Sequence, residues 1–424
     1  MRFPKGFLIG AATAAHQVEG NNIHSDYWAQ EHMQFTSFNE PSGDACDHYH
    51  RFEEDIRLLA EAGLNAYRFS IEWARIEPQP GVFDENEIGH YRKVLLCCRE
   101  HGVEPIVTMH HFTSPKWLIE QGGWEAEGTV EKFARYCRYV VEKLGDLMHY
   151  VCTINEANMG IQVAAIARRY TLLMQRKMKA EGQIQVGINL ENPMMARMKQ
   201  QAREHMQLFG TPQPQVFVAP RTPEGDLLVM KAHQAAKAAM KAVKPDLKIG
   251  ITLSLHDIQP QPGGEAMAQK EWDEEFLHYL PYIREDDFFG LQNYTRTLMG
   301  PEGSLPVPEG AESTQMEYEF YPQALGHVIR TVHRSLPIPI MVTENGVAVA
   351  DDERRVAFIE EALKGVQGCV EDGIPVLGYM YWSLLDNFEW QKGFSMTFGL
   401  VAVDRATQQR TPKGSLAFLG SFTR

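Results

Sequence analysis

Short apolar runs alternate with helix-like segments along the whole of this 424-residue chain. Runs of this kind, bounded by turn residues, predict buried strands of a parallel sheet. The candidate strands are residues 7–12, 66–71, 105–109, 150–154, 248–253, 288–292, 338–342 and 376–382. Parallel strands joined by right-handed helical crossovers close naturally into a barrel when eight are present. The sequence therefore predicts an α/β fold, a single (β/α)8 TIM barrel with elaborated loops on its C-terminal face.

The segments between the strands have helical periodicity. In residues 129–144, apolar residues recur at three- and four-residue steps, and Gly145 follows as a helix stop. Residues 226–243 and 356–370 behave similarly. A doubly wound open sheet is the alternative, but it normally brings a glycine-rich phosphate turn, and the sequence contains neither GxGxxG nor GxxxxGKS/T.

The whole chain, residues 1–424, is expected to form one domain, because insertions enlarge such barrels as a single unit. Residues 160–225 are the least regular part and contain a patch rich in Met and basic residues. Two interpretations of this insertion-like segment remain open. It shapes the mouth of a pocket, or it adds one or two helices packed on the barrel with Met as gap filler.

Composition excludes several classes of protein. The formal net charge of −14 argues against nucleic acid or an anionic membrane as partner. No apolar run reaches 18 residues, and the N-terminus is typical of a first strand rather than a signal peptide. None of the six cysteines forms a CxxC pair, which favours buried free thiols in a reducing compartment. A cytoplasmic location is expected.

Two carboxylates stand at strand ends of matching construction. Glu344 ends the apolar stretch PIPIMVTENG, and Glu156 ends HYVCTINEAN. In a βα barrel the C-terminal ends of the strands form the catalytic face, so both acids are expected on one rim. The alternative is that each acid only caps a helix or binds an Arg.

Other strand ends carry amide, imidazole, carboxylate and aromatic groups. These are Gln17, Arg68, His111, Asn155, Tyr294, Trp382, Glu389 and Trp390. Amides, imidazole and carboxylate can bond sugar hydroxyls, Trp can stack on the apolar sugar face, and paired carboxylates supply acid, base or nucleophile. A metal is the competing use, but neither HExxH nor a Cys/His set with zinc spacing occurs, and no GxSxG elbow supports a serine triad.

Seven segments together resemble glycoside hydrolase family 1, whose best-known members are β-glucosidases and β-galactosidases. They are FLIGAATAAHQVEG at 7–20, YRFSIEWARIEP at 67–78, HFTSPKWLIEQGGW at 111–124, TINEAN at 153–158, VTENG at 342–346, WSLLDNFEWQKGFSMTFGLVAVD at 382–404 and RTPKGS at 410–415. The resemblance covers nearly the whole chain except roughly residues 160–225.

The resemblance implies a retaining β-glycosidase without metal or organic cofactor, with small β-glucosides or oligosaccharides as substrates. It implies Glu344 as nucleophile and Glu156 as general acid/base, with their carboxyl groups roughly 5–5.5 Å apart. Arg68 and Tyr294 would flank the nucleophile. The sugar would be held by Gln17, His111, Asn155, Tyr294, Trp382, Glu389 and Trp390.

The chain departs from the family mainly on the leaving-group side. Ala157 stands where Pro is usual, and Tyr318 where Trp is usual; both are expected at the pocket mouth. Glucose, galactose or fucose preference stays open. The alternatives are a 6-phospho-β-glycosidase, which Glu389 disfavours by charge, and a non-catalytic sugar-binding barrel, which the presence of both acids disfavours.

Overall fold

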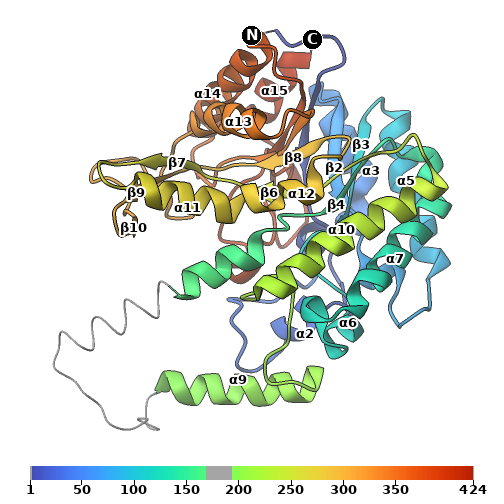
Figure 1. The fold of residues 1–424 in the computed structure, drawn as a ribbon. Coiled ribbons are helices and arrows are strands. Elements are labelled where there is room, and N and C mark those ends of the chain that lie inside the picture. Colours follow the sequence, from blue (N-terminus) through green and yellow to red (C-terminus); the bar gives the residue numbers. More distant parts are fainter. Residues whose placement is uncertain (1, 169–192, 424) are drawn as a thin grey trace, which may run out of the picture.

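The computed structural model describes residues 2–168 and 193–423, and nine parallel strands form its nearly closed barrel sheet (Figure 1). Their order is β5-β4-β3-β2-β1-β12-β11-β8-β6. The strands are β1 (Leu8–Ala12), β2 (Ala66–Ser70), β3 (Glu104–His110), β4 (Tyr150–Ile154), β5 (Lys248–Gly250), β6 (Thr252–Ser254), β8 (Phe289–Gln292), β11 (Ile340–Asn345) and β12 (Val376–Trp382). The predicted barrel is confirmed, and every neighbouring pair in this sheet is parallel.

The predicted fifth strand, residues 248–253, appears as two strands separated by Ile251. β5 pairs with β4, whereas β6 pairs with β8. One stretch of chain therefore changes partner halfway along its length and joins the two ends of the sheet. The nine strands correspond in this way to the eight strands of a closed barrel.

The predicted seventh strand, residues 338–342, was wrong at both ends. β11 begins after Pro339, which has no backbone N–H to donate to the sheet. It continues to Asn345, and its register with β8 shifts between Val342 and Glu344. Glu344 therefore lies within the strand, next to an irregularity that redirects the end of the strand.

A layer of helices surrounds the barrel. The longer ones are α3 (His48–Ala62), α5 (Glu85–Glu100), α7 (Gly128–Leu144), α10 (Pro223–Val243), α11 (Glu265–Glu275), α13 (Ala324–Ser335) and α14 (Asp352–Glu371). The shorter ones are α1 (Ala15–Val18), α2 (Asp26–Glu31), α4 (Trp73–Ile76), α6 (Lys116–Glu120), α12 (Leu280–Ile283) and α15 (Gly414–Gly420). Contacts of α10 with α7, α7 with α5, α5 with α3, α3 with α15, α15 with α14 and α14 with α13 make this layer continuous.

Local sequence explains where two of these helices begin. The hydroxyl of Thr222 accepts a hydrogen bond from the N–H of Gly225, and Pro223 occupies the first turn of α10. Asp351 accepts a bond from the N–H of Glu353 at the start of α14. A side-chain acceptor before the first turn satisfies amides that have no partner within the helix.

Segments after the strands gather at one end of the barrel. Figure 1 shows α2 and α6, which follow β1 and β3, at the lower end together with α9 (Pro193–Phe209), while both chain termini lie at the upper end. The helix that begins at residue 159 is described as far as residue 168. The insertion-like segment 160–225 is thus helical where it is described at 160–168 and in α9; residues 169–192 lie outside the described residues.

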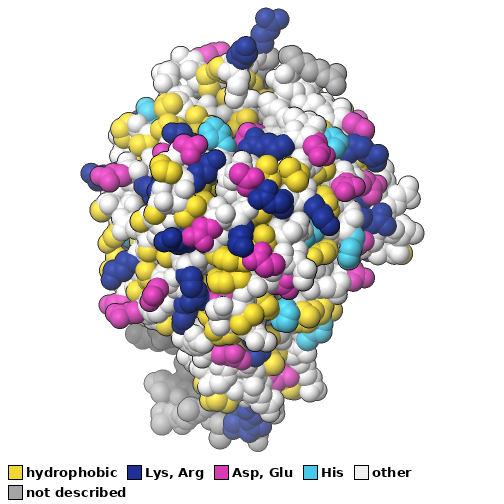
Figure 2. Space-filling model, turned by 90° about the vertical axis from the view of Figure 1, so that its right-hand side faces the viewer, with side chains coloured by type: hydrophobic (Ala, Val, Ile, Leu, Met, Phe, Trp, Pro, Cys, Tyr) yellow, Lys and Arg dark blue, Asp and Glu magenta, His cyan; other side chains and the backbone are white. Residues whose placement is uncertain are grey.

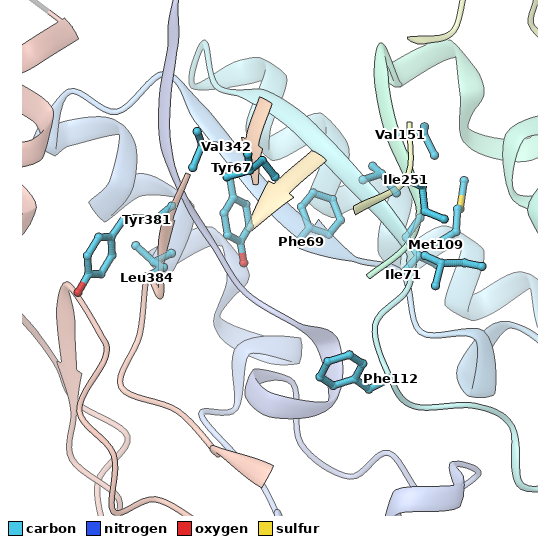
Figure 3. Packing of buried hydrophobic residues seen from close by; sticks show 14 of the residues in the cluster. Tyr67, Phe69, Ile71, Met109, Phe112, Val151, Ile251, Val342, Tyr381 and Leu384 are labelled. Carbon is cyan, nitrogen blue, oxygen red and sulfur yellow. The ribbon is translucent and has the colours of Figure 1, made fainter. Parts of the chain in front are cut away.

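The apolar core has two parts. A small cluster inside the barrel includes Ala12, Ala66, Ile106, Cys152 and Met380. A larger cluster lies between the strands and the helices, and Figure 3 labels Tyr67, Phe69, Ile71, Met109, Phe112, Val151, Ile251, Val342, Tyr381 and Leu384 from it. Successive strand residues point to opposite faces, so the strands serve both clusters.

Two small sheets were not predicted. One, of order β10-β9-β7, contains β7 (Asp257–Pro260), β9 (Arg296–Gly300) and β10 (Gly303–Ser304); the other pairs β13 (Val401–Val403) with β14 (Arg410–Pro412). These strands have two to five residues and lie in Pro- and Gly-rich or polar sequence. Such strands carry almost no periodic signal.

The surface carries charges of both signs, and the cysteines are buried. On the face in Figure 2, Lys and Arg side chains are interspersed with Asp and Glu. All six cysteines are buried and unpaired. Across residues 2–168 and 193–423, no helix combines the length and apolar character needed to span a membrane.

Candidate active site

A cavity of about 290 Å³ opens where the barrel strands end. Seven of the residues predicted for the site line it: His111, Glu156, Tyr294, Glu344, Trp382, Glu389 and Trp390. They come from the ends of five different strands or the loops that follow them. The structure therefore brings together side chains that the sequence places up to 279 residues apart (390 − 111).

Glu344 is fixed by two donors. Its Oε1 accepts a hydrogen bond from Arg68 Nη1 at 2.7 Å, and its Oε2 accepts one from the Tyr294 hydroxyl at 2.6 Å. Arg68 is fully buried, and Glu344 is 3% exposed. Hydrogen bonds from a cation and a hydroxyl favour the ionised carboxylate and lock its orientation.

Asn155 is held by its oxygen and leaves its nitrogen unused. Its Oδ1 accepts bonds from Arg68 Nη2 at 2.6 Å and Gln292 Nε2 at 2.7 Å. Its Nδ2 is buried and, within the described residues, has no hydrogen-bond partner. Buried polar atoms are normally paired, so an orphaned amide donor in such a place indicates a ligand.

Gln17 lies behind the cavity rather than on its wall. Its Nε2 donates to the carbonyl oxygen of Phe388 at 2.7 Å and to Glu389 Oε2 at 3.3 Å. Its Oε1 is buried without a partner in the part of the chain that the structure describes. The Gln17 amide thus orients Glu389 and still offers an acceptor.

Aromatic rings form another part of the cavity wall. The His111 ring stacks with Trp382 at 5.6 Å and with Trp390 at 6.1 Å between centroids. Burial and the nearby Arg68 charge hold the pKa of His111 well below its usual range, so its imidazole is neutral. A neutral imidazole between indole rings suits a ligand with hydroxyls and an apolar face.

Glu156 occupies an unusual backbone conformation. Its φ of 44° lies in the left-handed region, which non-glycine residues seldom adopt. The Glu156 N–H donates to Thr252 Oγ1 at 2.8 Å, and the next N–H, of Ala157, donates to Thr252 O at 3.0 Å. Strand β6 therefore holds the turn that presents the Glu156 carboxyl to the cavity.

The two acids differ in the state they favour. Burial, followed by the charge of Glu344, raises the pKa of Glu156 from 4.5 to about 8. Burial also raises the pKa of Glu344, but Arg68 and Tyr294 oppose that shift. The hydrogen bonds from Arg68 and Tyr294 favour the ionised form of Glu344, whereas Glu156 is the carboxylic acid near neutral pH, which is the division of roles needed for nucleophile and proton donor.

Glu389 is the third carboxyl group in the cavity. Burial, and then the charge of Glu344, raises the pKa of Glu389 to about 8. The hydrogen bond from Gln17 opposes this shift. Glu389 can consequently donate as well as accept hydrogen bonds with ligand hydroxyls near neutral pH.

The raised pKa of Glu156 predicts how its replacement changes stability. Folding favours the protonated acid, so this contribution is present below pH 4.5 and is lost as pH rises through about 8. Glu156→Gln should therefore raise the free energy of unfolding by on the order of 4 kcal/mol at pH 8, with little change at pH 4.5. Denaturant unfolding at both pH values measures this.

The matched control for that experiment is Glu142→Gln. Glu142 is exposed and forms an ion pair with Arg138 at 2.7 Å, so its replacement removes no buried charge. Its effect should stay within about 0.5 kcal/mol at both pH values. If Glu156→Gln is only as stable as the wild type at pH 8, the inferred cost of burying the Glu156 charge is contradicted.

Several residues that line the cavity were not predicted, and one of the two positions expected at its mouth lies elsewhere. The unpredicted ones are Phe112, Met159, Val218, His256, Thr295, Met316 and Phe398. Phe112, His256 and Thr295 lie two or three residues after the ends of β3, β6 and β8 and so follow the strand-end pattern that found the others. Ala157 is fully buried and does not line the cavity, which corrects its expected place at the mouth. Tyr318 does line the cavity, with its ring 6.5 Å from that of Tyr294.

His48, His50 and His110 each lie against a different partner. His48 pairs with Asp55 and His50 with Asp47, each at 2.7 Å. His110 Nε2 lies 3.0 Å from the Ser114 hydroxyl. Among residues 2–168 and 193–423, no three His, Cys, Asp or Glu side chains are grouped so that they could hold a metal ion.

Known proteins share both the sequence and the fold of this chain. A β-glucosidase from Agrobacterium sp. (strain ATCC 21400) is 32% identical over 98% of this chain and 94% of its own. The crystal structure of the β-glycosidase BGL167 is 47% identical, covers 100% of this chain and 97% of its own, and has a TM-score of 0.89. A structure of β-glucosidase 1317 is 40% identical over 99% and 98%, with a TM-score of 0.87.

The family model described as Glycosyl hydrolase family 1 matches residues 1–195 and 285–424. The matched part contains both acids, the Arg68 and Tyr294 anchors of Glu344, and the Trp382–Trp390 segment. The chain therefore belongs to glycosyl hydrolase family 1.

Proposed function

We propose that this protein is a retaining β-glycosidase that hydrolyses terminal β-D-glucosyl residues of small β-glucosides or oligosaccharides. One observation carries the proposal: the cavity contains a carboxylate anchored by Arg68 and Tyr294 and, beside it, a carboxyl group whose pKa is raised to about 8. This pair supplies a nucleophile and a proton donor in the same place.

In the first step, a Glu344 oxygen attacks the anomeric carbon of the sugar. The bond from that carbon to the leaving oxygen breaks, and Glu156 gives its proton to that oxygen. The products are a glucosyl ester of Glu344, the free alcohol and the Glu156 carboxylate. Arg68 and Tyr294 orient the attacking carboxylate, and the loss of the Glu344 charge favours ionisation of Glu156.

In the second step, Glu156 removes a proton from water, whose oxygen attacks the same anomeric carbon. The ester bond to Glu344 breaks, which restores the carboxylate and the protonated Glu156. Two inversions leave the β configuration unchanged. The chemistry needs no group beyond these side chains and water.

The sugar itself is assigned to the polar side of the cavity. Asn155 Nδ2 donates to a hydroxyl near the anomeric carbon, and Gln17 and Glu389 bind the outer hydroxyls. His111 and Trp390 complete the polar rim, and Trp382 stacks on the apolar sugar face. The unpaired buried atoms of Gln17 and Asn155 support this assignment.

A 6-phospho-β-glycosidase is the alternative, and the lack of a cation in the cavity disfavours it. No Lys or Arg is among the described residues that line the cavity. A phosphate on the outer hydroxyl would be a buried charge with no cation beside it, and above about pH 8 the ionised Glu389 would repel it as well. Buried unpaired charge costs more than a missing contact.

We therefore expect kcat/KM for p-nitrophenyl β-D-glucoside to exceed that for its 6-phosphate by about 100-fold or more. Initial-rate measurements on the two substrates at pH 6 and pH 8 test this. A higher kcat/KM for the phosphate would select the alternative. Hydrolysis of neither substrate would instead favour a non-catalytic sugar-binding barrel.

We also propose that residues 1–424 act as one catalytic domain in a cytoplasmic setting. Pairing of β1 with β12, from opposite ends of the sequence, supports the first point. The Glu204 carboxylate of α9 accepts hydrogen bonds from the N–H groups of Gln34 and Phe35. These bonds tie α9, within the insertion-like segment, to the loop after α2. Six buried free cysteines support the second point, and cell fractionation tests it.

A further inference from the structure

Polar atoms on the cavity wall or directly behind it fall into two groups. On the side assigned to the sugar, Gln17 Oε1 and Asn155 Nδ2 are buried without a protein partner in the described chain. Two further polar residues of the wall are already engaged. The Thr295 hydroxyl donates to Glu319 O at 2.7 Å, and His256 Nδ1 lies 2.8 Å from Glu275 Oε1. These two residues are less available to a ligand.

Tyr318 belongs with the first group. Its hydroxyl is buried and, in the part of the chain described, unpaired. Burial raises the pKa of Tyr318, and the charge of Glu389 raises it further. The Tyr318 ring lies 6.5 Å from the ring of Tyr294, whose hydroxyl bonds Glu344, so Tyr318 belongs to the Tyr294 side of the wall.

Met159 and Val218 form an apolar part of the wall beside Glu156, next to the His256 ring, whose Nδ1 is taken by Glu275. The Met159 N–H donates to Glu156 O at 2.9 Å, so Met159 begins the helix directly behind the proton donor. Arg221 ties Val218 to the same place: Nη1 donates to Ala157 O at 2.9 Å and Nη2 to Phe217 O at 2.7 Å. Met159 and Val218 both line the cavity.

Because Glu156 protonates the leaving oxygen, the group attached to that oxygen departs along this wall. A second sugar would bring hydroxyl groups to thioether and aliphatic surface, where they would lose hydrogen bonds with water. An aryl or alkyl group would instead remove apolar surface from water on both sides.

Resting on the proposed function, we infer that the leaving-group side of this cavity binds an apolar aglycone, an aryl or alkyl group, in preference to a second sugar. Met159 and Val218 supply its contact surface. The preference is a property of the segment after β4, and Val218 lies outside the part of the chain that the family model matches.

A series of alkyl β-D-glucosides tests the inference, because methyl, butyl, hexyl and octyl alcohols are similar in acidity and differ mainly in apolar area. Full burial of one methylene corresponds to about a fourfold gain in kcat/KM. We expect kcat/KM to rise by about tenfold or more from methyl to hexyl glucoside. Cellobiose should be poorer than hexyl glucoside although its leaving oxygen is the more acidic.

Two substitutions place polar atoms on the wall at nearly constant volume, Met159→Gln and Val218→Thr. Each should lower the ratio of kcat/KM for hexyl over methyl glucoside by about threefold or more. The matched controls are Met206→Gln and Val82→Thr, whose side chains belong to residues 49% and 54% exposed. The controls should leave the ratio unchanged.

The outcomes separate this inference from the proposed function. Suppose that the enzyme hydrolyses p-nitrophenyl β-D-glucoside, but that kcat/KM is the same for all alkyl glucosides or is higher for cellobiose than for hexyl glucoside. The preference for an apolar aglycone is then wrong, and the proposed β-glucosidase activity is unaffected. Hydrolysis of no glucoside overturns the function itself. A rising series in the wild type supports the inference even if one variant fails to fold.

Discussion

Glu344→Ala is expected to lower kcat for p-nitrophenyl β-D-glucoside by at least about 10⁴-fold. Without the carboxylate, no glucosyl ester can form, and the remaining groups only bind the sugar and donate a proton. The substitution removes the nucleophile, and Arg68 and the Tyr294 hydroxyl each lose a hydrogen-bond acceptor. Steady-state kinetics at saturating substrate measure the loss.

Azide should restore turnover in the Glu344→Ala variant. The small anion fits the space left by the carboxylate and attacks the anomeric carbon from the same side as Glu344 would. One inversion then yields the α-glucosyl azide, while Glu156 protonates the leaving oxygen. Proton NMR of the product distinguishes this α-azide from a β-azide and from glucose.

The control variant for both measurements is Glu104→Ala. Glu104 begins β3 at the opposite end of the barrel and pairs with Arg99 at 2.6 Å. Its loss should leave kcat within about twofold and make the enzyme no more responsive to azide. Near-wild-type turnover of Glu344→Ala, or a β-azide product, would remove Glu344 from the nucleophile role.

The fold was predictable where a strand is apolar throughout. Residues 150–154 and 376–382 match β4 and β12 to the residue, because apolar runs with clear ends give an unambiguous signal. The limits of β11 were not predictable in the same way. Pro339 delays the start of the ladder, and the irregularity near Glu344 carries polar residues into the strand.

The strand-end rule predicted much of the site, and it missed lining residues that lie farther from the end of a strand. Glu156 lies two residues after β4 and Glu344 is the second-last residue of β11, so topology alone places them on one rim. Met159, Val218 and Met316 come from loops and helices that follow the strands at variable distances. Their apolar side chains resemble core residues in the sequence, and only the folded loops bring them to the cavity.

Ala157 shows how a local departure from family sequence can mislead. A residue next to the proposed acid Glu156 is expected to face the same pocket, yet Ala157 is fully buried. The left-handed conformation of Glu156 turns the two side chains in different directions. The N–H of Ala157 also donates to Thr252 O, a bond that the usual Pro could not make.

Glu156→Ala is expected to divide substrates by the acidity of their leaving groups. A 2,4-dinitrophenolate departs without a proton, so the first step with that glucoside should stay within about tenfold of the wild type. A methyl glucoside needs the proton, and its kcat/KM should fall by about 10³-fold or more. Initial rates for a series of aryl and alkyl glucosides give the dependence on leaving-group acidity.

The second step should be slow in this variant for every substrate, because no base activates water. The glucosyl ester of Glu344 should therefore accumulate with the dinitrophenyl substrate, visible as a burst of product and as a mass increase on the protein. Azide needs no base, so it should release the sugar as the β-glucosyl azide. In the wild type, ionisation of Glu156 is expected to lower activity above about pH 8, and the part of this loss that is due to Glu156 should be absent from the variant.

Glu389→Gln provides the comparison, because it alters the same cavity without touching the proton transfer. Glu389 is assigned to the sugar, which all these substrates share, so its replacement should lower kcat/KM by a similar factor for good and poor leaving groups. Its product with azide should remain glucose, since Glu156 still activates water. If Glu156→Ala instead loses equal activity on dinitrophenyl and methyl glucosides, its role is to bind or orient the sugar, and the proton must come from another group.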